Sequence, residues 1–145
     1  MKERIKIPFV ENKSVVPVVR FTLDSGATGC AVIDTGSEST VFDKDFVLQN
    51  KKSFRIEVTE NKISLVGVME NNEAPIVYGT SSVEFAGQPG FKLDMQGMII
   101  PLKNIESNLG FPPAAIIGSD VLNKLGAKLN FKRKTMTLYN DLSGK

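Results

Sequence analysis

The residues best suited to chemistry in this chain form the segment Asp34-Thr35-Gly36-Ser37. Three apolar residues at 31–33 precede it, so the Asp34 carboxylate should emerge from a buried strand into a sheltered place. Gly36 allows a tight turn that brings its amide near this carboxylate, Thr35 offers a hydroxyl to lock the turn, and Ser37 offers one to the carboxylate itself. An ordinary Asx turn after a buried strand would use the same residues without any chemistry. The segment alone leaves both interpretations open.

Missing residue types narrow the possible chemistry. The chain has no histidine, which removes Ser-His and Cys-His nucleophiles, histidine-ligated zinc and histidine proton shuttles. Its only cysteine, Cys30, lies in an apolar run, where we expect a buried structural thiol, and one thiol cannot form an internal disulfide or a thiolate metal site. Carboxylates, lysines and tyrosines remain for acid–base work, and this elimination favours an aspartic mechanism.

Length and composition indicate one globular domain spanning residues 1–145. A chain of 145 residues that is 41% apolar and 23% charged can bury a core without metals or disulfides. A net charge of +2 indicates no nucleic-acid partner, and we expect the basic cluster at 132–134 to form a hairpin turn. No run approaches the roughly 20 apolar residues of a membrane span, and the N-terminus is too charged for a signal peptide. As the chain stands, we expect a soluble, cytoplasmic protein without a membrane partner.

Strand patterns dominate the chain. Short runs rich in Val, Ile and Phe alternate with turn residues, which favours an antiparallel sandwich or barrel over βαβ units. A helical turn is expected at 43–49, and a helix that starts from an N-cap at Ser119 or Asp120 should stop at Gly126. The expected strands span residues 15–23, 28–33, 54–58, 63–69, 76–85, 91–100, 127–131 and 135–138. The pattern predicts a mainly β domain with one short C-terminal helix.

A second segment, residues 115–118, supports a functional interpretation of residues 34–37. Ala115-Ile116-Ile117-Gly118 is an apolar run that ends in Gly and leads directly into the expected helix. With residues 33–37, it resembles the pepsin and retropepsin superfamily, in which an apolar-apolar-Gly segment crosses beneath the catalytic turn and feeds a short helix. Residues 127–138 resemble the closing strands of bacterial retropepsin-like members. The resemblance runs from about residue 15 to 138 and implies an all-β, closed or sandwich-like acid-protease fold, as a single lobe of the bacterial or cellular type.

The same resemblance implies a flap, a hairpin at about 65–78 that closes over the substrate. The substrate contacts that it implies are Ser37, Glu38, Val66, Gly67, Val68 and Met69. An ordinary surface hairpin is the alternative, because the Gly-rich flap tip of viral members is absent. Viral members also carry an Arg after the second Gly, where this chain has Ser119, so Glu38 lacks that partner and is better explained as a solvated surface residue than as a substrate contact.

Aspartic chemistry needs two carboxylates that share one proton, because two like charges about 3 Å apart cannot both ionise. The chain has one Asp-Thr-Gly and no second lobe, and Asp120 belongs to the helix start. A working enzyme must therefore be a symmetric homodimer, with Asp34 from each subunit meeting at the two-fold axis. The resemblance adds that Thr35 from each subunit would hydrogen-bond across that axis.

We therefore predict an aspartic-type endopeptidase without metal or cofactor, whose catalytic turn is Asp34, Thr35 and Gly36. Its substrate would be a peptide or protein segment bound as an extended strand, with water as the nucleophile. The alternative is a catalytically silent module of the same fold that binds peptides or only dimerises, because a fold does not certify chemistry. A carboxylate-based phosphotransferase fits less well, since no metal-binding acids cluster near Asp34.

Overall fold

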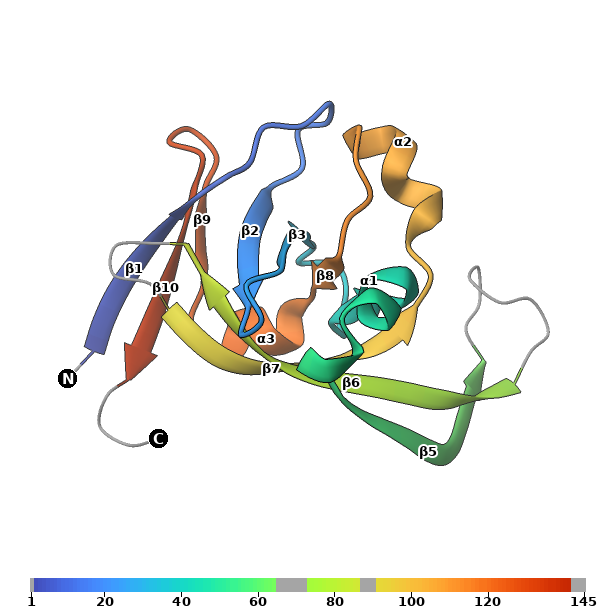
Figure 1. Ribbon diagram of the computed structural model, residues 1–145. Coiled ribbons are helices and arrows are strands. Elements are labelled where there is room, and N and C mark those ends of the chain that lie inside the picture. Colours follow the sequence, from blue (N-terminus) through green and yellow to red (C-terminus); the bar gives the residue numbers. More distant parts are fainter. Residues whose placement is uncertain (1, 65–72, 87–90, 142–145) are drawn as a thin grey trace.

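Most of the chain is β-structure in the computed structural model, which describes residues 2–64, 73–86 and 91–141 (Figure 1). The strands are β1 (Lys2–Pro8), β2 (Val18–Leu23), β3 (Thr28–Ile33), β4 (Val41–Asp43), β5 (Arg55–Ser64), β6 (Glu73–Phe85), β7 (Phe91–Ile100), β8 (Ala115–Ile117), β9 (Lys128–Asn130) and β10 (Thr135–Asp141). The helices are α1 (Lys44–Gln49), α2 (Glu106–Leu109) and α3 (Ser119–Lys124), with 3-10 turns η1 (Lys51–Ser53) and η2 (Lys103–Ile105).

Six strands close into a barrel in the order β2-β3-β8-β4-β7-β6, because each pairs with the next and β6 returns to β2. The closing pair places Phe21 beside Phe85 and Leu23 beside Val83. All four of these side chains are buried in one core. β5 lies outside the ring and pairs with β6 alone among the described strands. The all-β, closed fold expected from the sequence is confirmed.

β8 comes from late in the chain and inserts between two strands that are consecutive in sequence. It runs parallel to β3, with Ile117 beside Ile33, and antiparallel to β4, with Ile116 beside Val41. Only residues 34–40 connect β3 to β4. The inserted strand therefore lies directly under the connection that carries Asp34, which is the crossing that the resemblance implied.

The two ends of the described chain form a second sheet in the order β1-β10-β9 (Figure 1). β1 and β10 pair along their full lengths, and their inward side chains Ile5, Ile7, Met136 and Leu138 join the core of the barrel. The connection between β9 and β10 carries the basic cluster at 132–134, so the expected hairpin turn is confirmed. This terminal sheet is part of the fold rather than an appendage to it.

One local expectation is confirmed, and two are corrected. The helical turn at 43–49 forms as α1, capped by the Asp43 carboxylate, which accepts from Phe46 N at 3.1 Å. α2 was not expected, since its four residues are too few to show an apolar period. Cys30 is half-buried rather than buried, because it alternates with the buried Ala31 and faces outward from β3.

Removing core volume from the terminal sheet tests its part in the fold. Leu138→Ala deletes a fully buried side chain, and we expect the free energy of unfolding in urea to fall by about 2–5 kcal/mol. Thr137→Ala, on the opposite face of β10, should cost clearly less. Equal losses in the two variants would show that the sheet does not share the barrel core.

Candidate active site

Asp34 stands at the end of β3, where the chain leaves the barrel. Asp34, Thr35 and Gly36 are all exposed. Gly36 N donates to Asp34 Oδ1 at 2.9 Å, and Ser37 N donates to Asp34 O at 3.2 Å, so the expected tight turn forms. Asp34 Oδ2 accepts no hydrogen bond from the described residues. One carboxylate oxygen is thus held by the backbone, while the other is available to a group outside this chain.

Beneath the turn, the backbone of residues 117–119 packs directly against the backbone of residues 34–39. Asp34 N donates to Ile117 O at 3.0 Å, and Ser119 N donates to Ser37 O at 2.7 Å. A Cβ on Gly118 would lie 2.7 Å from Ser37 O and 2.8 Å from the carbonyl carbon and oxygen of Ser39. Those contacts are too short for any side chain, so the Gly of the apolar-apolar-Gly segment is required by close approach.

A buried hydroxyl ties the same crossing to α3. Thr40 Oγ1 donates to Asp120 Oδ1 at 2.8 Å and accepts from Gly118 N at 3.0 Å. Thr40 N donates to Asp120 Oδ2 at 3.1 Å, so both oxygens of that carboxylate are engaged by one residue. Thr40 is only 1% exposed, which makes these bonds costly to leave unmade.

The N-cap expected at Ser119 or Asp120 is wrong. Gly118 occupies the N-cap position of α3 without a side-chain hydrogen bond, because its tight contact with residues 37–39 leaves no room for a side chain. Asp120 lies in the first helical turn, where its carboxylate accepts from Val121 N and reaches across to Thr40. Sequence reasoning missed Thr40, whose only local signal is a hydroxyl residue placed directly before the buried strand β4.

The other expected residues of the turn lie at the surface. Ser37 Oγ donates to Ser39 O at 2.8 Å, so this hydroxyl closes the turn and does not bond the Asp34 carboxylate as expected. Glu38 is exposed, and no ion pair to it occurs among the described residues. Thr35 is exposed beside Asp34, with its side chain open to a partner from outside the chain.

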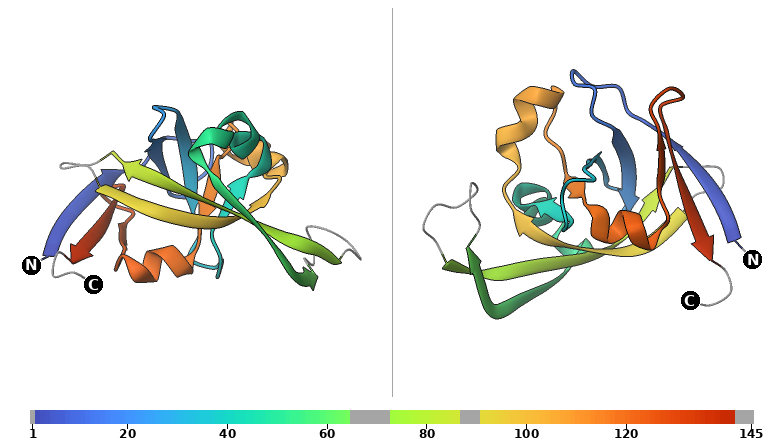
Figure 2. Two further views of the ribbon diagram at one scale, coloured as in Figure 1. Left: turned by 60° about the horizontal axis from the view of Figure 1, so that its bottom comes forward. Right: turned by 180° about the vertical axis from the view of Figure 1, so that it is seen from behind.

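The expected hairpin is present and longer than the sequence suggested. β5 and β6 pair from Arg55 with Thr80 to Ser64 with Glu73, with a register shift between Val58 and Lys62. Figure 2 shows from two directions that this hairpin projects beyond the barrel. The expected flap tip, Val66, Gly67, Val68 and Met69, lies outside the described residues.

Neither a metal cluster nor a membrane-spanning helix is present in the part of the chain that the structure describes. In residues 2–64, 73–86 and 91–141, no group of three or more Cys, Asp or Glu side chains is placed to hold a metal ion. Within the same ranges, no helix has the length and apolar character needed to cross a membrane.

Comparison with known proteins bears on the fold. No protein-family model matches the chain, and no curated protein sequence does. Among solved structures, a retropepsin-like aspartic protease from Rickettsia conorii aligns over 96% of this chain and 92% of its own, with a TM-score of 0.51 and 13% identity. The retroviral protease-like domain of Ddi1 from Leishmania major aligns over 85% and 89%, with a TM-score of 0.55 and 14% identity. The chain has the retropepsin-like fold that the two sequence motifs indicated.

Gly118→Ala tests the backbone contact beneath the turn. Because its Cβ would meet fixed backbone atoms, we expect a loss of about 1–3 kcal/mol or more in the free energy of unfolding. Gly36→Ala is the matched control, since its Cβ would meet only Asp34 Oδ1, at 3.3 Å, and it should unfold close to wild type. Equal stability of the two variants would contradict the contact.

Thr40→Val tests the buried hydroxyl. The substitution keeps the shape of the side chain but leaves Gly118 N and the Asp120 carboxylate without their partner, so about 1–3 kcal/mol should be lost. Thr40→Ser keeps the hydroxyl and should recover most of this loss. A Val variant as stable as the Ser variant in chemical denaturation would rule out the network.

Proposed function

We propose that the chain is an aspartic-type endopeptidase that works as a homodimer with one Asp34 from each subunit. The observation that carries the proposal is the exposed Asp34 carboxylate, fixed by Gly36 N at the crossing of β3 and β8. The fold is shared with solved structures of proteases named retropepsin-like, which supports the proposal at the level of architecture.

The need for a second copy follows from the acids around the turn. Asp120 belongs to the same crossing, but both its oxygens are engaged by Thr40. Glu38 follows the turn in sequence and is exposed. Among the described residues, no ion pair holds it against Asp34. Asp34, Thr35 and Gly36 are all exposed, so a two-fold partner can reach them. Asp34 of a second subunit is the carboxylate that completes the pair.

The chemistry then follows from one proton shared by two carboxylates. The ionised Asp34 takes a proton from water as the water oxygen attacks the peptide carbonyl carbon, and the protonated Asp34 of the other subunit donates its proton to the carbonyl oxygen. As the tetrahedral intermediate collapses, the C–N bond breaks and the Asp34 that took the proton from water donates it to the leaving nitrogen. The other Asp34 takes a proton from the hydroxyl that becomes part of the product carboxyl group, so the pair again shares one proton. No covalent bond to the enzyme forms at any step.

An extended peptide is the substrate that this arrangement suits. The β5–β6 hairpin would cover the peptide, and the catalytic turn would lie beneath it. Ser37, Glu38 and the segment Val66, Gly67, Val68 and Met69 are proposed as its contacts. Ile56 and Val58 on β5 expose 45% and 65% of their surface, so the hairpin offers apolar area that a substrate can cover.

Asp34→Asn tests both the acid–base role of Asp34 and the need for a dimer. The amide can neither take nor give the required proton, so cleavage of a peptide library should fall by at least about 100- to 10,000-fold. Because a mixed dimer holds one carboxylate, excess Asp34→Asn chain added to wild-type chain should lower activity well beyond dilution. Asp45→Asn, an equal change at an exposed acid in α1, should leave both readings unchanged.

Two results would contradict the proposal. Undiminished cleavage by Asp34→Asn would remove Asp34 from the chemistry, and activity proportional to wild-type chain in the mixtures would remove the dimer. Wild-type chain that binds peptides but never cuts them, with binding that survives in Asp34→Asn, would instead establish the silent binding module.

A further inference from the structure

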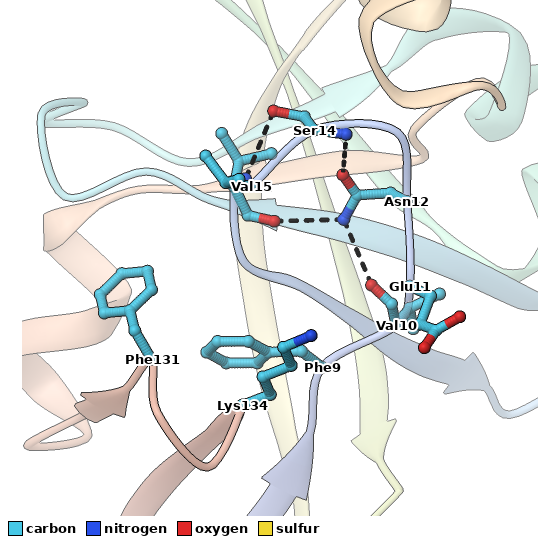
Figure 3. A pocket seen from close by; sticks show the side chains of 9 residues that line it. Phe9, Val10, Glu11, Asn12, Ser14, Val15, Phe131 and Lys134 are labelled. Atoms are coloured by element: carbon cyan, nitrogen blue, oxygen red, sulfur yellow. Dashed lines mark hydrogen bonds between the residues drawn. The ribbon is translucent and has the colours of Figure 1, made fainter.

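A hollow of about 460 Å³ lies between the segment that joins β1 to β2 and the turn that joins β9 to β10 (Figure 3). It is enclosed by residues 9–16, which lead from β1 to β2 and are called the strap below, and by the β9–β10 turn, residues 131–134. The strap ends where Pro17 O accepts from Ile33 N at 2.9 Å, one residue before Asp34. The side chains that matter most for its chemistry are Phe9, Glu11, Val15, Val16, Phe131 and Lys134.

Apolar side chains around this hollow are exposed to solvent. Val15 exposes 94% of its surface and Phe131 exposes 59%. Phe131 meets Phe9 edge to face, with ring centroids 6.1 Å apart, so an aromatic wall faces the valine (Figure 3). A cluster of exposed apolar groups around a concave surface marks a place where another molecule binds.

The strap is held rigid although it exposes Val15. Asn12 Oδ1 accepts from Ser14 N at 2.8 Å, and Asn12 Nδ2 donates to the carbonyls of Val10 and Val16, both at 3.2 Å (Figure 3). Lys13 N also donates to Leu109 O at 3.2 Å, which anchors the strap to α2. A surface fixed in this way loses little conformational entropy when it binds a partner.

The charged residues of the strap and of the β9–β10 turn indicate what kind of partner would bind. Of the 18 basic and 16 acidic residues in the chain, the strap and the turn hold four and one, which leaves 14 and 15 elsewhere. The strap and the turn therefore carry a net charge of +3. Lys134 and Glu11 line the hollow itself, Lys132 and Arg133 are exposed in the same turn, and the Lys13 side chain lies against Gly110. A two-fold contact between copies through this face would bring the basic turns together, whereas an acidic partner would neutralise them.

We propose that this hollow is a docking site for an acidic peptide segment that carries one bulky apolar side chain. The apolar side chain would enter between Val15 and Phe131, while the carboxylates meet Lys134 and the cations next to it. Peptide binding here does not need Asp34. Only the role of the bound segment, as a part of the substrate that lies outside the cleaved bond, rests on the proposed peptidase.

Lys134 allows a clean charge removal. Its φ of 55° lies in the left-handed region that glycine adopts without strain, so Lys134→Gly deletes the charge without a backbone cost. Val15→Ser removes an apolar group that packs against little of the fold, as its 94% exposure shows. Lys44→Ala, an equal loss of charge at an exposed site in α1, is the control.

Binding is measured by fluorescence anisotropy on the Asp34→Asn chain, with a labelled peptide of about ten residues in which acidic residues flank one leucine. Lys134→Gly and Val15→Ser should each weaken binding about tenfold, and Lys44→Ala by less than about twofold. Replacing the peptide's acids by glutamine, or its leucine by alanine, should weaken binding to the unaltered surface to a similar extent.

Any of four outcomes would overturn the docking site. The glutamine peptide could bind as tightly as the acidic peptide, the three variants could bind the peptide with equal affinity, or the chain could prefer anionic lipid vesicles to the peptide. Loss of self-association in Val15→Ser, without a change in peptide binding, would assign the surface to a second copy. With active wild-type chain, joining the segment to a cleavable peptide should lower KM and leave kcat unchanged. Because binding is read on Asp34→Asn, absence of peptidase activity would leave the binding result intact.

Discussion

The backbone of Gly118 passes so close to residues 37–39 that no side chain fits between the two segments. This contact can form only if β8 inserts between β3 and β4, which in turn brings Ile117 beside Ile33 and fixes the exit of the chain at Asp34. The position of the carboxylate therefore depends on a strand that is more than 80 residues away along the chain. Any side chain at 118 would push the two segments apart and move Asp34 with them.

The polar groups at this crossing are satisfied by one another. Thr40 joins Gly118 N to the Asp120 carboxylate, so a buried amide, a buried hydroxyl and a carboxylate complete one small network. A fully satisfied network is rigid, because breaking any one of its hydrogen bonds leaves a buried polar group without a partner. Asp34 lies outside this network and keeps an oxygen free, so the crossing is rigid while the proposed reactive group above it remains accessible.

The turn at Asp34 and the crossing beneath it were predictable because each depends on a short run of unusual residues. Asp34 before a glycine turn, and two isoleucines before Gly118, are local patterns with a local physical cause. The bond between Thr40 and Asp120 was not predictable, since its partners are 80 residues apart and each also suits an ordinary local role. α2 is too short to show a period, and the hollow is formed by segments from opposite ends of the chain that become neighbours only when β1 pairs with β10.

In the proposed enzyme, two chains build one active site. Titration with a tight-binding peptide that carries a hydroxyl-bearing mimic of the tetrahedral intermediate measures this directly, by isothermal calorimetry at protein concentrations above the dimer dissociation constant. We expect saturation at one inhibitor for every two chains, with no binding to the Asp34→Asn chain. Saturation at one inhibitor per chain, or equal binding to Asp34→Asn, would contradict it.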